Sequence, residues 1–384
     1  MKINPFIPYV FTGKVGDFIS PSYDTISPKE MKRLLSMKYN VTHLIAKNNG
    51  RATLERMIDD GLLKQHGEGF IILVQKFSFS GKNMTRIGII GAVDPSNERT
   101  KLFPHENTFE EFVEYRKRTF KELMSQVEPI FVVVPLRKLD ERLNSLISNR
   151  KPDLSFTSAD SVRNYVYMVG ESDSVSSIQK YLLHSVGYIA DGHHRFRALT
   201  EINERRASEG KKTLSVLCYL TSLYSESLLI NGINRVAKLK SRQSALTRVS
   251  SNFKVSGPIR KPPEERMAIY DGEMREIVPT ETSSTSLRYM GVEEAQFTDY
   301  SDMLILPDIF NGSKNFSEQE LRYVVNQEEA LEMVNSNKGT LAILIPPWSK
   351  RQFVKVARSG RLMRPKSTYF FPKIPAGIAV YKME

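Results

Sequence analysis

Cysteine is nearly absent from the sequence, since Cys218 is the only one among 384 residues. A single cysteine excludes an intrachain disulfide bond and any zinc site built from several thiolates. No apolar run approaches the about 20 residues that a membrane-spanning helix needs. The first residues, Met1–Pro5, carry no apolar stretch of the kind found in signal peptides. We therefore expect a cytoplasmic protein with no membrane partner.

Several common catalytic and nucleotide-binding motifs are also missing. There is no G-x-x-x-x-G-K-[ST] phosphate-binding loop and no G-x-G-x-x-G after a predicted strand. The H-R-D and D-F-G motifs of protein kinases and the G-x-S-x-G turn of hydrolases are absent as well. Cys218 lies in an apolar run, which indicates a core residue and argues against cysteine catalysis.

Basic residues are in excess, with 55 Lys and Arg against 43 Asp and Glu, so the formal net charge is +12. This charge favours a polyanionic or phosphorylated partner, nucleic acid included. A solvated basic surface without a specific partner explains the charge equally well, because net charge alone selects no ligand. Hydrophobic residues make up 40% and charged residues 26% of the chain, which is typical of a globular protein.

Runs of β-branched and apolar residues predict buried strands, and capped amphipathic patterns predict helices between them. The predicted strands are Gly69–Phe77, Arg86–Val93, Pro129–Pro135, Thr213–Leu220 and Thr340–Ile345. The predicted helices are Pro28–Lys38, Thr108–Met124, Gly192–Ser208 and Ser349–Ser359. Because the two kinds of element do not alternate strictly, we expect an α+β fold.

One segment, Lys254–Glu265, is rich in proline, lysine and arginine and predicts a surface connection. It would separate an N-terminal region, residues 1–253, from a C-terminal α/β region, residues 254–384.

The most unusual segment joins a short apolar strand to a helix through Asp191, Gly192, His193, His194 and Arg195. The start of a helix presents backbone N–H groups and about half a positive charge, so it suits phosphate. Arginine can bind two phosphate oxygens at once, and histidine can donate from one ring nitrogen. The aspartate either caps the helix or holds Mg²⁺ beside a bound phosphate.

This A-D-G-H-H-R segment resembles a family of bacterial and archaeal proteins of poorly defined function, whose fold is related to ParB and sulfiredoxin. The family includes free L-serine kinases, which phosphorylate serine from ADP or ATP. Further segments resemble the family in the same order along the chain. They are Ile19–Glu30, which contains a P-x-E box, Pro104–Thr108, an H-E-x-T box followed by Arg116, Leu229–Val236, and Pro365–Lys373, a P-K-S-T box.

The resemblance implies a ParB/sulfiredoxin-like nucleotide-binding core elaborated by an α/β region, with the P-K-S-T box returning to the core site. It implies transfer of phosphate from ATP or ADP, with Mg²⁺, to a small hydroxyl acceptor such as free L-serine. Glu30 would be the catalytic base, and Asp191 and His193 would be the other catalytic residues. Gly192, His194 and Arg195 would bind the phosphates.

The resemblance also implies a substrate-binding role for three residues of the P-K-S-T box, Lys366, Ser367 and Thr368. Their ammonium and hydroxyl groups can bind a carboxylate or a phosphoryl oxygen. The kinases carry T-T-R-H near this point, whereas this chain has Ser367–Phe370, so the arginine and the histidine are lost. Asn234 likewise replaces a family histidine. The chain is therefore a divergent member.

Three further residues are secondary candidates: Asp24, His105 and Glu106. His105 can orient a phosphate or pair with Glu106, and a structural role at the start of the following helix is the alternative. A second class of function is a nucleotide- or nucleic-acid-binding regulator of the ParB type without transfer chemistry. A third is a degenerate scaffold. The sequence does not identify the acceptor, the nucleotide or the oligomeric state.

Overall fold

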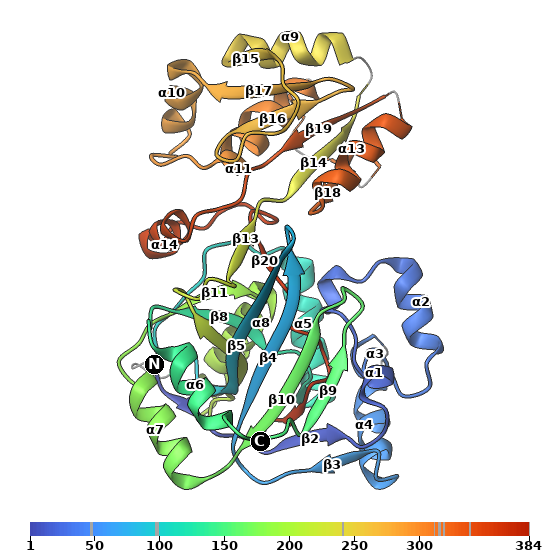
Figure 1. Ribbon diagram of the computed structural model, residues 1–384, viewed down its shortest axis with the longest axis vertical. Coiled ribbons are helices and arrows are strands. Elements are labelled where there is room, and N and C mark those ends of the chain that lie inside the picture. Colours follow the sequence, from blue (N-terminus) through green and yellow to red (C-terminus); the bar gives the residue numbers. More distant parts are fainter. Residues whose placement is uncertain are drawn as a thin grey trace. The chain divides into compact units, whose positions relative to one another are not determined.

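The computed structural model describes residues 1–46, 49–96, 100–239, 242–310, 312–313, 316–317, 319–337 and 339–383. It contains two compact units (Figure 1). Unit 1 comprises Met1–Leu229, Ala357–Gly360 and Phe370–Glu384, and unit 2 comprises Ile230–Val356 and Arg361–Tyr369. The second unit therefore begins earlier in the chain than the region expected from residue 254.

Unit 1 is built on a mixed nine-stranded sheet. Eight strands follow the order β6-β11-β8-β12-β5-β4-β10-β9, and the ninth, β1, pairs with the C-terminal end of β5. β11 runs parallel to β6 and β12 runs parallel to β8, whereas the other neighbours are antiparallel. The strands are β1 (Ile3–Asn4), β4 (Phe70–Phe79), β5 (Lys82–Val93), β6 (Leu102–Phe103), β8 (Ile130–Val134), β9 (Leu154–Thr157), β10 (Arg163–Val169), β11 (Gly187–Asp191) and β12 (Val216–Ser222).

Helices cover this sheet because alternate residues of its central strands are apolar on both faces. On β8, Ile130, Val132 and Val134 join one apolar cluster, to which four helices contribute buried residues. Phe131 points to the opposite face, where its ring contacts Tyr219 and Phe370. The four helices are α5 (Glu110–Leu123), α6 (Leu139–Ile147), α7 (Ser172–Leu182) and α8 (His193–Ser208).

A second, four-stranded sheet in unit 1 joins the two ends of the chain, with the order β3-β2-β21-β7. Its apolar residues pack with the N-terminal helices, which gather beside it (Figure 1). This pairing holds the first and last segments within one unit. The strands are β2 (Pro8–Phe11), β3 (Leu63–Gln65), β7 (Ser125–Gln126) and β21 (Val380–Lys382), and the helices are α1 (Val15–Phe18), η1 (Tyr23–Thr25), α2 (Pro28–Ser36), α3 (Thr42–Ile45) and α4 (Gly50–Asp59).

Unit 2 has its own antiparallel sheet, with the order β15-β17-β16-β19-β14-β18, and its own apolar clusters. Lys254–Pro258, part of the expected surface connection, lies in β15 and pairs with β17. The elements are β14 (Asn234–Lys238), α9 (Arg242–Asn252), β15 (Phe253–Pro258), β16 (Met267–Tyr270), β17 (Met274–Pro279), α10 (Glu281–Tyr289), α11 (Phe297–Tyr300), η2 (Ser301–Ile305), α12 (Leu306–Ile309), β18 (Leu321–Val324), α13 (Gln327–Ser336) and β19 (Thr340–Leu344). The remaining elements, β13 (Leu229–Asn231), α14 (Lys350–Ser359) and β20 (Tyr369–Phe371), span the division between the units.

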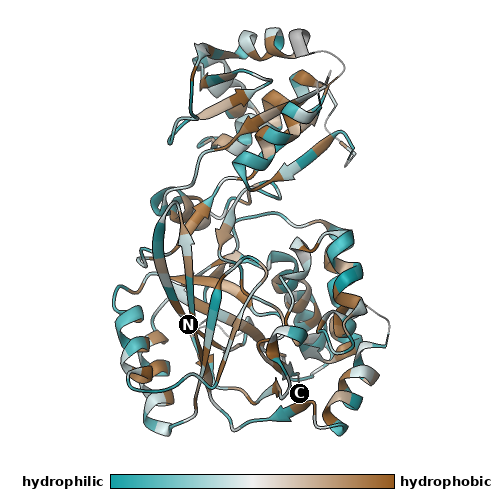
Figure 2. Cartoon of the chain, turned by 45° about the vertical axis from the view of Figure 1, so that its right-hand side comes forward, coloured by the Kyte–Doolittle hydropathy of each residue, from teal (hydrophilic) through white to brown (hydrophobic). Residues whose placement is uncertain are grey.

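All nine predicted helices and strands are confirmed, and each lies within a few residues of its expected bounds. Figure 2 shows hydrophobic colour along many strands of both units and hydrophilic colour on the outer helices. Among the described residues, no helix is both long and apolar enough to cross a membrane.

Candidate functional site

The turn between β11 and α8 depends on a glycine. Gly192 has a φ of +88°, a left-handed conformation that residues with a Cβ atom rarely adopt. A Cβ atom at this position would also lie 2.8 Å from the Ile130 side chain. Gly192 is the N-cap residue of α8 and has no side chain to bond the N–H groups of the first turn. The helix thus begins without a side-chain cap from this residue, and the positive end of its dipole lies at the turn.

Asp191 lies between two cations. Its Oδ1 is 2.5 Å from Nζ of Lys373, and its Oδ2 is 3.3 Å from Nη2 of Arg195. Both carboxylate oxygens therefore form ion pairs, and neither caps α8. Because Lys373 comes from the C-terminal segment, this contact joins the last residues of the chain to the histidine-rich turn.

Arg195 points into unit 1. Only 3% of its surface is exposed, and its guanidinium donates to the carbonyl of Pro129 at 2.8 Å and to Asp191. Its Nε is buried and has no hydrogen-bond partner among the described residues. Arg195 therefore fixes Asp191 against β8, and the more accessible cation of the pair is Lys373, whose side chain is 13% exposed.

His193 and His105 form a buried pair. Nε2 of His193 lies 3.1 Å from Nδ1 of His105, and the same Nδ1 lies 2.8 Å from the carbonyl oxygen of Ile189. Because a carbonyl only accepts, the network assigns the His105 proton to Nδ1, and His193 Nε2 is then an acceptor. Neutral His193 consequently carries its proton on Nδ1.

Burial keeps both imidazoles of this pair neutral. Desolvation lowers the pKa of His105 from 6.5 to about 4, and Lys373 adds a smaller lowering. Desolvation also holds the pKa of His193 well below its usual range, with further lowering from His105, His194, Lys373 and Arg195. The site therefore gains no positive charge from these rings at neutral pH.

His194 lies on a different side of the first turn of α8. Its Nε2 accepts a hydrogen bond from the backbone N–H of Phe109 at 3.1 Å. Its ring lies nearly parallel to that of Phe109 and nearly perpendicular to that of Phe112. Successive helical residues differ by about 100° in direction, so His193 enters the core while His194 meets the start of α5.

The N-terminal segment reaches the site through Glu128. This buried carboxylate accepts from the backbone N–H of Tyr23 at 2.7 Å and from Arg116 at 2.9 Å. The guanidinium of Arg116 also lies over the ring of Tyr23. Glu128 directly precedes Pro129, whose carbonyl binds Arg195, so the contacts of the N-terminal box and those of the turn involve adjacent residues of the chain.

Glu30 sits in the first turn of α2, where its N–H donates to the Ser27 side chain. Its carboxylate forms two hydrogen bonds with Arg33, at 2.6 and 2.9 Å. These contacts lower the pKa of Glu30, so the group is ionised at neutral pH. No hydrogen bond or ion pair between Glu30 and the Asp191 cluster occurs in the described part of the chain.

The P-K-S-T box is divided between the two units, with Lys373 in unit 1. Lys366, Ser367 and Thr368 belong to unit 2, and Ser367 Oγ donates to the carbonyl of Arg364. Glu106 is partly buried beside His105 in the chain. The side chain of Asp24 lies outside what the structure describes.

Two residues of the site received no role from the sequence. Lys373 was noted only as the end of the P-K-S-T box. Arg86 of β5 is fully buried and donates to the carbonyls of Phe371 and Pro372 and to Gln75. Arg86 could have been recognised from the sequence as a charged residue next to an apolar strand run. A buried guanidinium needs hydrogen-bond partners, so such a residue indicates a polar contact inside the fold.

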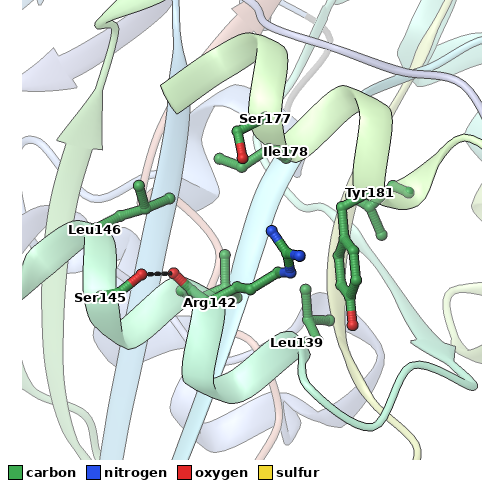
Figure 3. Close-up of a pocket in the computed structure, with 9 residues that line it drawn as sticks. Leu139, Arg142, Ser145, Leu146, Ser177, Ile178 and Tyr181 are labelled. Carbon is green, nitrogen blue, oxygen red and sulfur yellow. Dashed lines mark hydrogen bonds between the residues drawn. The ribbon is translucent and has the colours of Figure 1, made fainter. Parts of the chain in front are cut away.

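Two cavities lie away from this turn. One, of about 50 Å³, lies between α6 and α7 under Arg142 and Tyr181 (Figure 3). It is too small for a nucleotide, since ligand pockets usually hold about 300–1,000 Å³. The other, of about 780 Å³, lies along α5 and the second half of α8.

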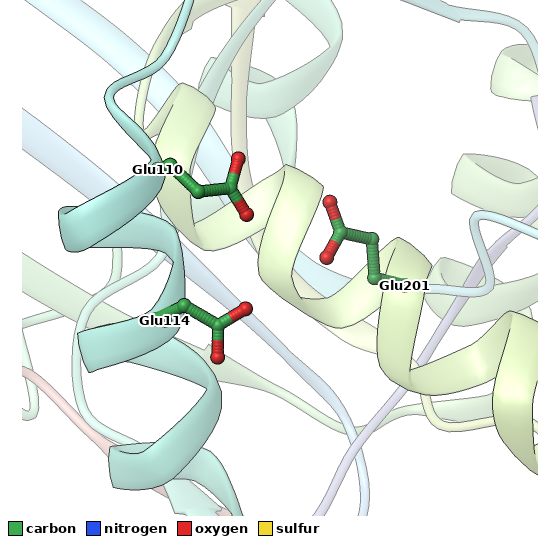
Figure 4. A group of neighbouring side chains, drawn as sticks. All are labelled: Glu110, Glu114 and Glu201. Carbon is green, nitrogen blue, oxygen red and sulfur yellow. The ribbon is translucent and has the colours of Figure 1, made fainter.

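Three carboxylates also meet on α5 and α8: Glu110, Glu114 and Glu201 (Figure 4). Lys117 forms ion pairs with Glu114 and Glu201, and Arg197 forms ion pairs with Glu110 and Glu201. These cations already neutralise much of the negative charge of the three carboxylates, so the cluster is a salt-bridge network between α5 and α8.

The sequence matches the family described as "Protein of unknown function (DUF1015)" over residues 3–301. No curated protein matches it. Among solved structures, a free serine kinase variant in complex with AMP is 15% identical, with a TM-score of 0.39, and the match covers 74% of this chain and 93% of that one. A conserved hypothetical protein from Pyrococcus furiosus is 14% identical, with a TM-score of 0.39, over 77% and 95%. SbnI with a C-terminal truncation, from Staphylococcus aureus, is 10% identical, with a TM-score of 0.41, over 76% and 87%.

Proposed function

We propose that this chain, which belongs to the family described as protein of unknown function (DUF1015), is a small-molecule kinase with a ParB/sulfiredoxin-like nucleotide-binding core. It transfers a phosphoryl group from ATP or ADP to a hydroxyl acceptor, and free L-serine is the first acceptor to test. The observation that supports this best is the placement of Asp191 between Lys373 and Arg195 at the start of α8.

The charges at this turn favour an anion. Lys373 and Arg195 carry two positive charges against one on Asp191, and the buried histidines stay neutral. The N-terminus of α8 adds a partial positive charge and backbone donors. In the absence of nucleotide, Asp191 balances part of this charge, and a bound phosphate takes over as the partner of Lys373.

His193 is suited to donate a hydrogen bond to the transferred group. Its Nε2 is held by His105, so the remaining proton is on Nδ1. A neutral donor fixed in this way binds a phosphoryl oxygen without losing a proton, and it needs no reorganisation during transfer. His105 then acts as a positioning residue behind it.

The turn does not fit a resident Mg²⁺ ion. Asp191 is its one carboxylate among the described residues, and both of its oxygens are already held by cations. Magnesium usually takes one or two carboxylates together with phosphate oxygens and water. The ion therefore belongs to the substrate and arrives with the nucleotide.

Glu30 is the proposed base. It is ionised at neutral pH, as a base must be. In the transfer, the acceptor hydroxyl gives its proton to the carboxylate, its oxygen bonds to phosphorus, and the bond from phosphorus to the nucleotide oxygen breaks. Arg33 has to release the carboxylate first, because it occupies both oxygens. Lys366, Ser367 and Thr368 are proposed to bind the acceptor.

The second candidate is a nucleotide- or nucleic-acid-binding regulator without transfer. The ion pair between Glu30 and Arg33 favours it, because that pair leaves the proposed base engaged. The net charge of +12 fits a nucleic-acid partner, and the affinity for such a partner would fall steeply as salt rises.

The test is incubation of the full chain with labelled ATP or ADP, Mg²⁺ and a panel of amino acids, with product identified by mass spectrometry. Glu30→Gln should abolish turnover and keep nucleotide binding. Glu55→Gln is the matched control, since Glu55 forms a similar exposed helical ion pair with Arg51. Turnover that survives Glu30→Gln contradicts the assigned base. No product and no nucleotide binding by the unmodified chain would overturn the proposal.

A further inference from the structure

Two exposed phenylalanines lie beside the histidine-rich turn. Phe109, the N-cap of α5, is 44% exposed, and Phe112, in the first turn of that helix, is 49% exposed. Their ring centroids are 5.8 Å apart with an interplanar angle of 78°. His194 completes the group, with centroids 6.3 Å from Phe109 and 5.5 Å from Phe112. We call these three residues the aromatic platform.

Contacts between the start of α5 and α8 support the backbone that carries the platform. The Phe109 N–H is bonded to His194, so the start of α5 is tied to the first turn of α8. Arg197 donates to Thr108 Oγ1 at 2.9 Å and pairs with Glu110 at 2.7 Å, on either side of Phe109 in the chain. These contacts fix the backbone on both sides of Phe109, which reduces the entropy lost when a ligand binds there.

The platform is also directly connected to the proposed phosphate site. His194 follows His193 in α8, and one turn of that helix rises only about 5 Å. His105, which supports His193, lies four residues before Phe109. One residue of the platform, His194, therefore adjoins the residues of the proposed phosphate site in α8.

The size of the platform favours a small flat ligand over a protein. A stable protein interface usually buries about 800 Å² on each partner, far more than two phenylalanines and one imidazole present. Other large apolar residues exposed in the described part of the chain include Tyr224 of unit 1 and Tyr289 of unit 2. Aromatic side chains stack well on nucleobases, since every base has a π-face.

We propose that the aromatic platform of Phe109, Phe112 and His194 binds the base of the nucleotide whose phosphates occupy the turn at Asp191–Arg195. This inference rests on the proposed function, because it assigns the base subsite of the same nucleotide. The stacking contact tolerates different bases and mainly adds affinity for a nucleotide over its bare phosphates.

The test compares ADP with inorganic tripolyphosphate, measured by isothermal titration calorimetry on the full chain. Phe109→Leu and Phe112→Leu remove the aromatic faces and keep apolar bulk, whereas Phe109→Tyr retains the stack. Tyr289→Leu, at an exposed tyrosine of unit 2, is the control. The two leucine variants should bind ADP roughly 5- to 150-fold more weakly than the unmodified chain. Their affinity for tripolyphosphate, and the ADP affinity of the tyrosine and control variants, should be unchanged.

Three results distinguish a failure of the platform proposal from a failure of the proposed function. Equal ADP affinity of the leucine variants and the unmodified chain overturns the platform while the phosphate site stands. If neither ligand binds the unmodified chain, the proposed function and the platform both fail. A loss of self-association in the leucine variants, with unchanged ADP affinity, assigns the patch to a second copy of the chain and overturns the proposal.

Discussion

Mild acid should destabilise unit 1 through the buried pair of His105 and His193. Burial lowers the pKa of His105 from 6.5 to about 4. It also lowers the pKa of His193, and the neighbouring His105 adds to that effect. Two protons cannot be added here without placing charged rings side by side in the core, next to Lys373.

The direction of the His105 pKa shift determines whether stability rises or falls with pH. A histidine with a lower pKa in the folded chain binds its proton more readily in the unfolded chain. The stability that depends on neutral His105 is complete above about pH 6.5 and is lost as the pH falls toward 4. For His105 alone, a shift from 6.5 to about 4 corresponds to a loss of about 3 kcal/mol by pH 4.

Urea unfolding of the full chain, followed by circular dichroism between neutral pH and about pH 4, measures this loss. The matched variant is His105→Asn, whose amide N–H can still donate to the carbonyl of Ile189. It should lose about 3 kcal/mol less stability than the unmodified chain over this range. His66→Asn, at an exposed histidine, should follow the unmodified chain. The single tryptophan, Trp348, belongs to unit 2 and provides a separate probe of that unit.

Two results would refute this reasoning. One is an equal loss of stability in His105→Asn and the unmodified chain, which would mean that carboxylates alone set the acid response. The other is a smaller loss in His66→Asn, which would place the responsible group on the surface.

Three further results are expected. Glu128→Gln should destabilise the chain by about 3–5 kcal/mol in urea unfolding, because it breaks an ion pair in which both side chains are only 4% exposed. Glu171→Gln, which removes a more exposed ion pair, should cost less than about 1 kcal/mol, and equal costs would contradict the argument. Gly192→Ala should lower both the melting temperature and nucleotide affinity, because a Cβ atom there is strained and meets a neighbour at 2.8 Å; unchanged values for both would count against it. Cys218 is buried with a raised pKa, so a thiol reagent should modify it only after unfolding, and rapid labelling of the native chain would contradict its placement.

Much of the fold could be predicted from local patterns. The apolar run in β8 and the capped start of α2, with Ser27 before Pro28, appear in the structure where the sequence indicates them. These signals succeed because strand burial and helix capping depend on neighbouring residues. Mixed pairing, such as β12 parallel to β8 and antiparallel to β5, could not be predicted, because it depends on contacts between distant segments.

The boundary between the two units also could not be predicted from local composition. Proline and lysine in Lys254–Glu265 indicated a surface connection, yet Lys254–Pro258 forms an edge strand of unit 2. Proline is tolerated on an edge strand because its missing N–H faces outward there. Composition alone does not distinguish such an edge from a linker.

The candidate site could be predicted in part. The sequence identified the turn, but it treated His193, His194 and Arg195 as one group facing a phosphate. The helical rotation sends His193 and Arg195 into the core and His194 toward Phe109. The role of Lys373 could not be predicted, because it depends on the return of the C-terminal segment to unit 1.

The balance of buried charge gives the strongest physical reason to expect an anion at this site. Arg86 is fully buried, none of the described carboxylates forms an ion pair with it, and its Nε has no hydrogen-bond partner. Gln75 links it to Lys373, since its side chain accepts from Arg86 and donates to the Lys373 carbonyl. At the turn, the single carboxylate of Asp191 is paired with two cations, Lys373 and Arg195. Burying such an excess is costly, and an anion bound at the turn would reduce that cost. Nucleotide or tripolyphosphate should accordingly raise the melting temperature of the full chain, and Lys373→Gln should remove most of that rise, whereas Lys64→Gln on the exposed strand β3 should retain it.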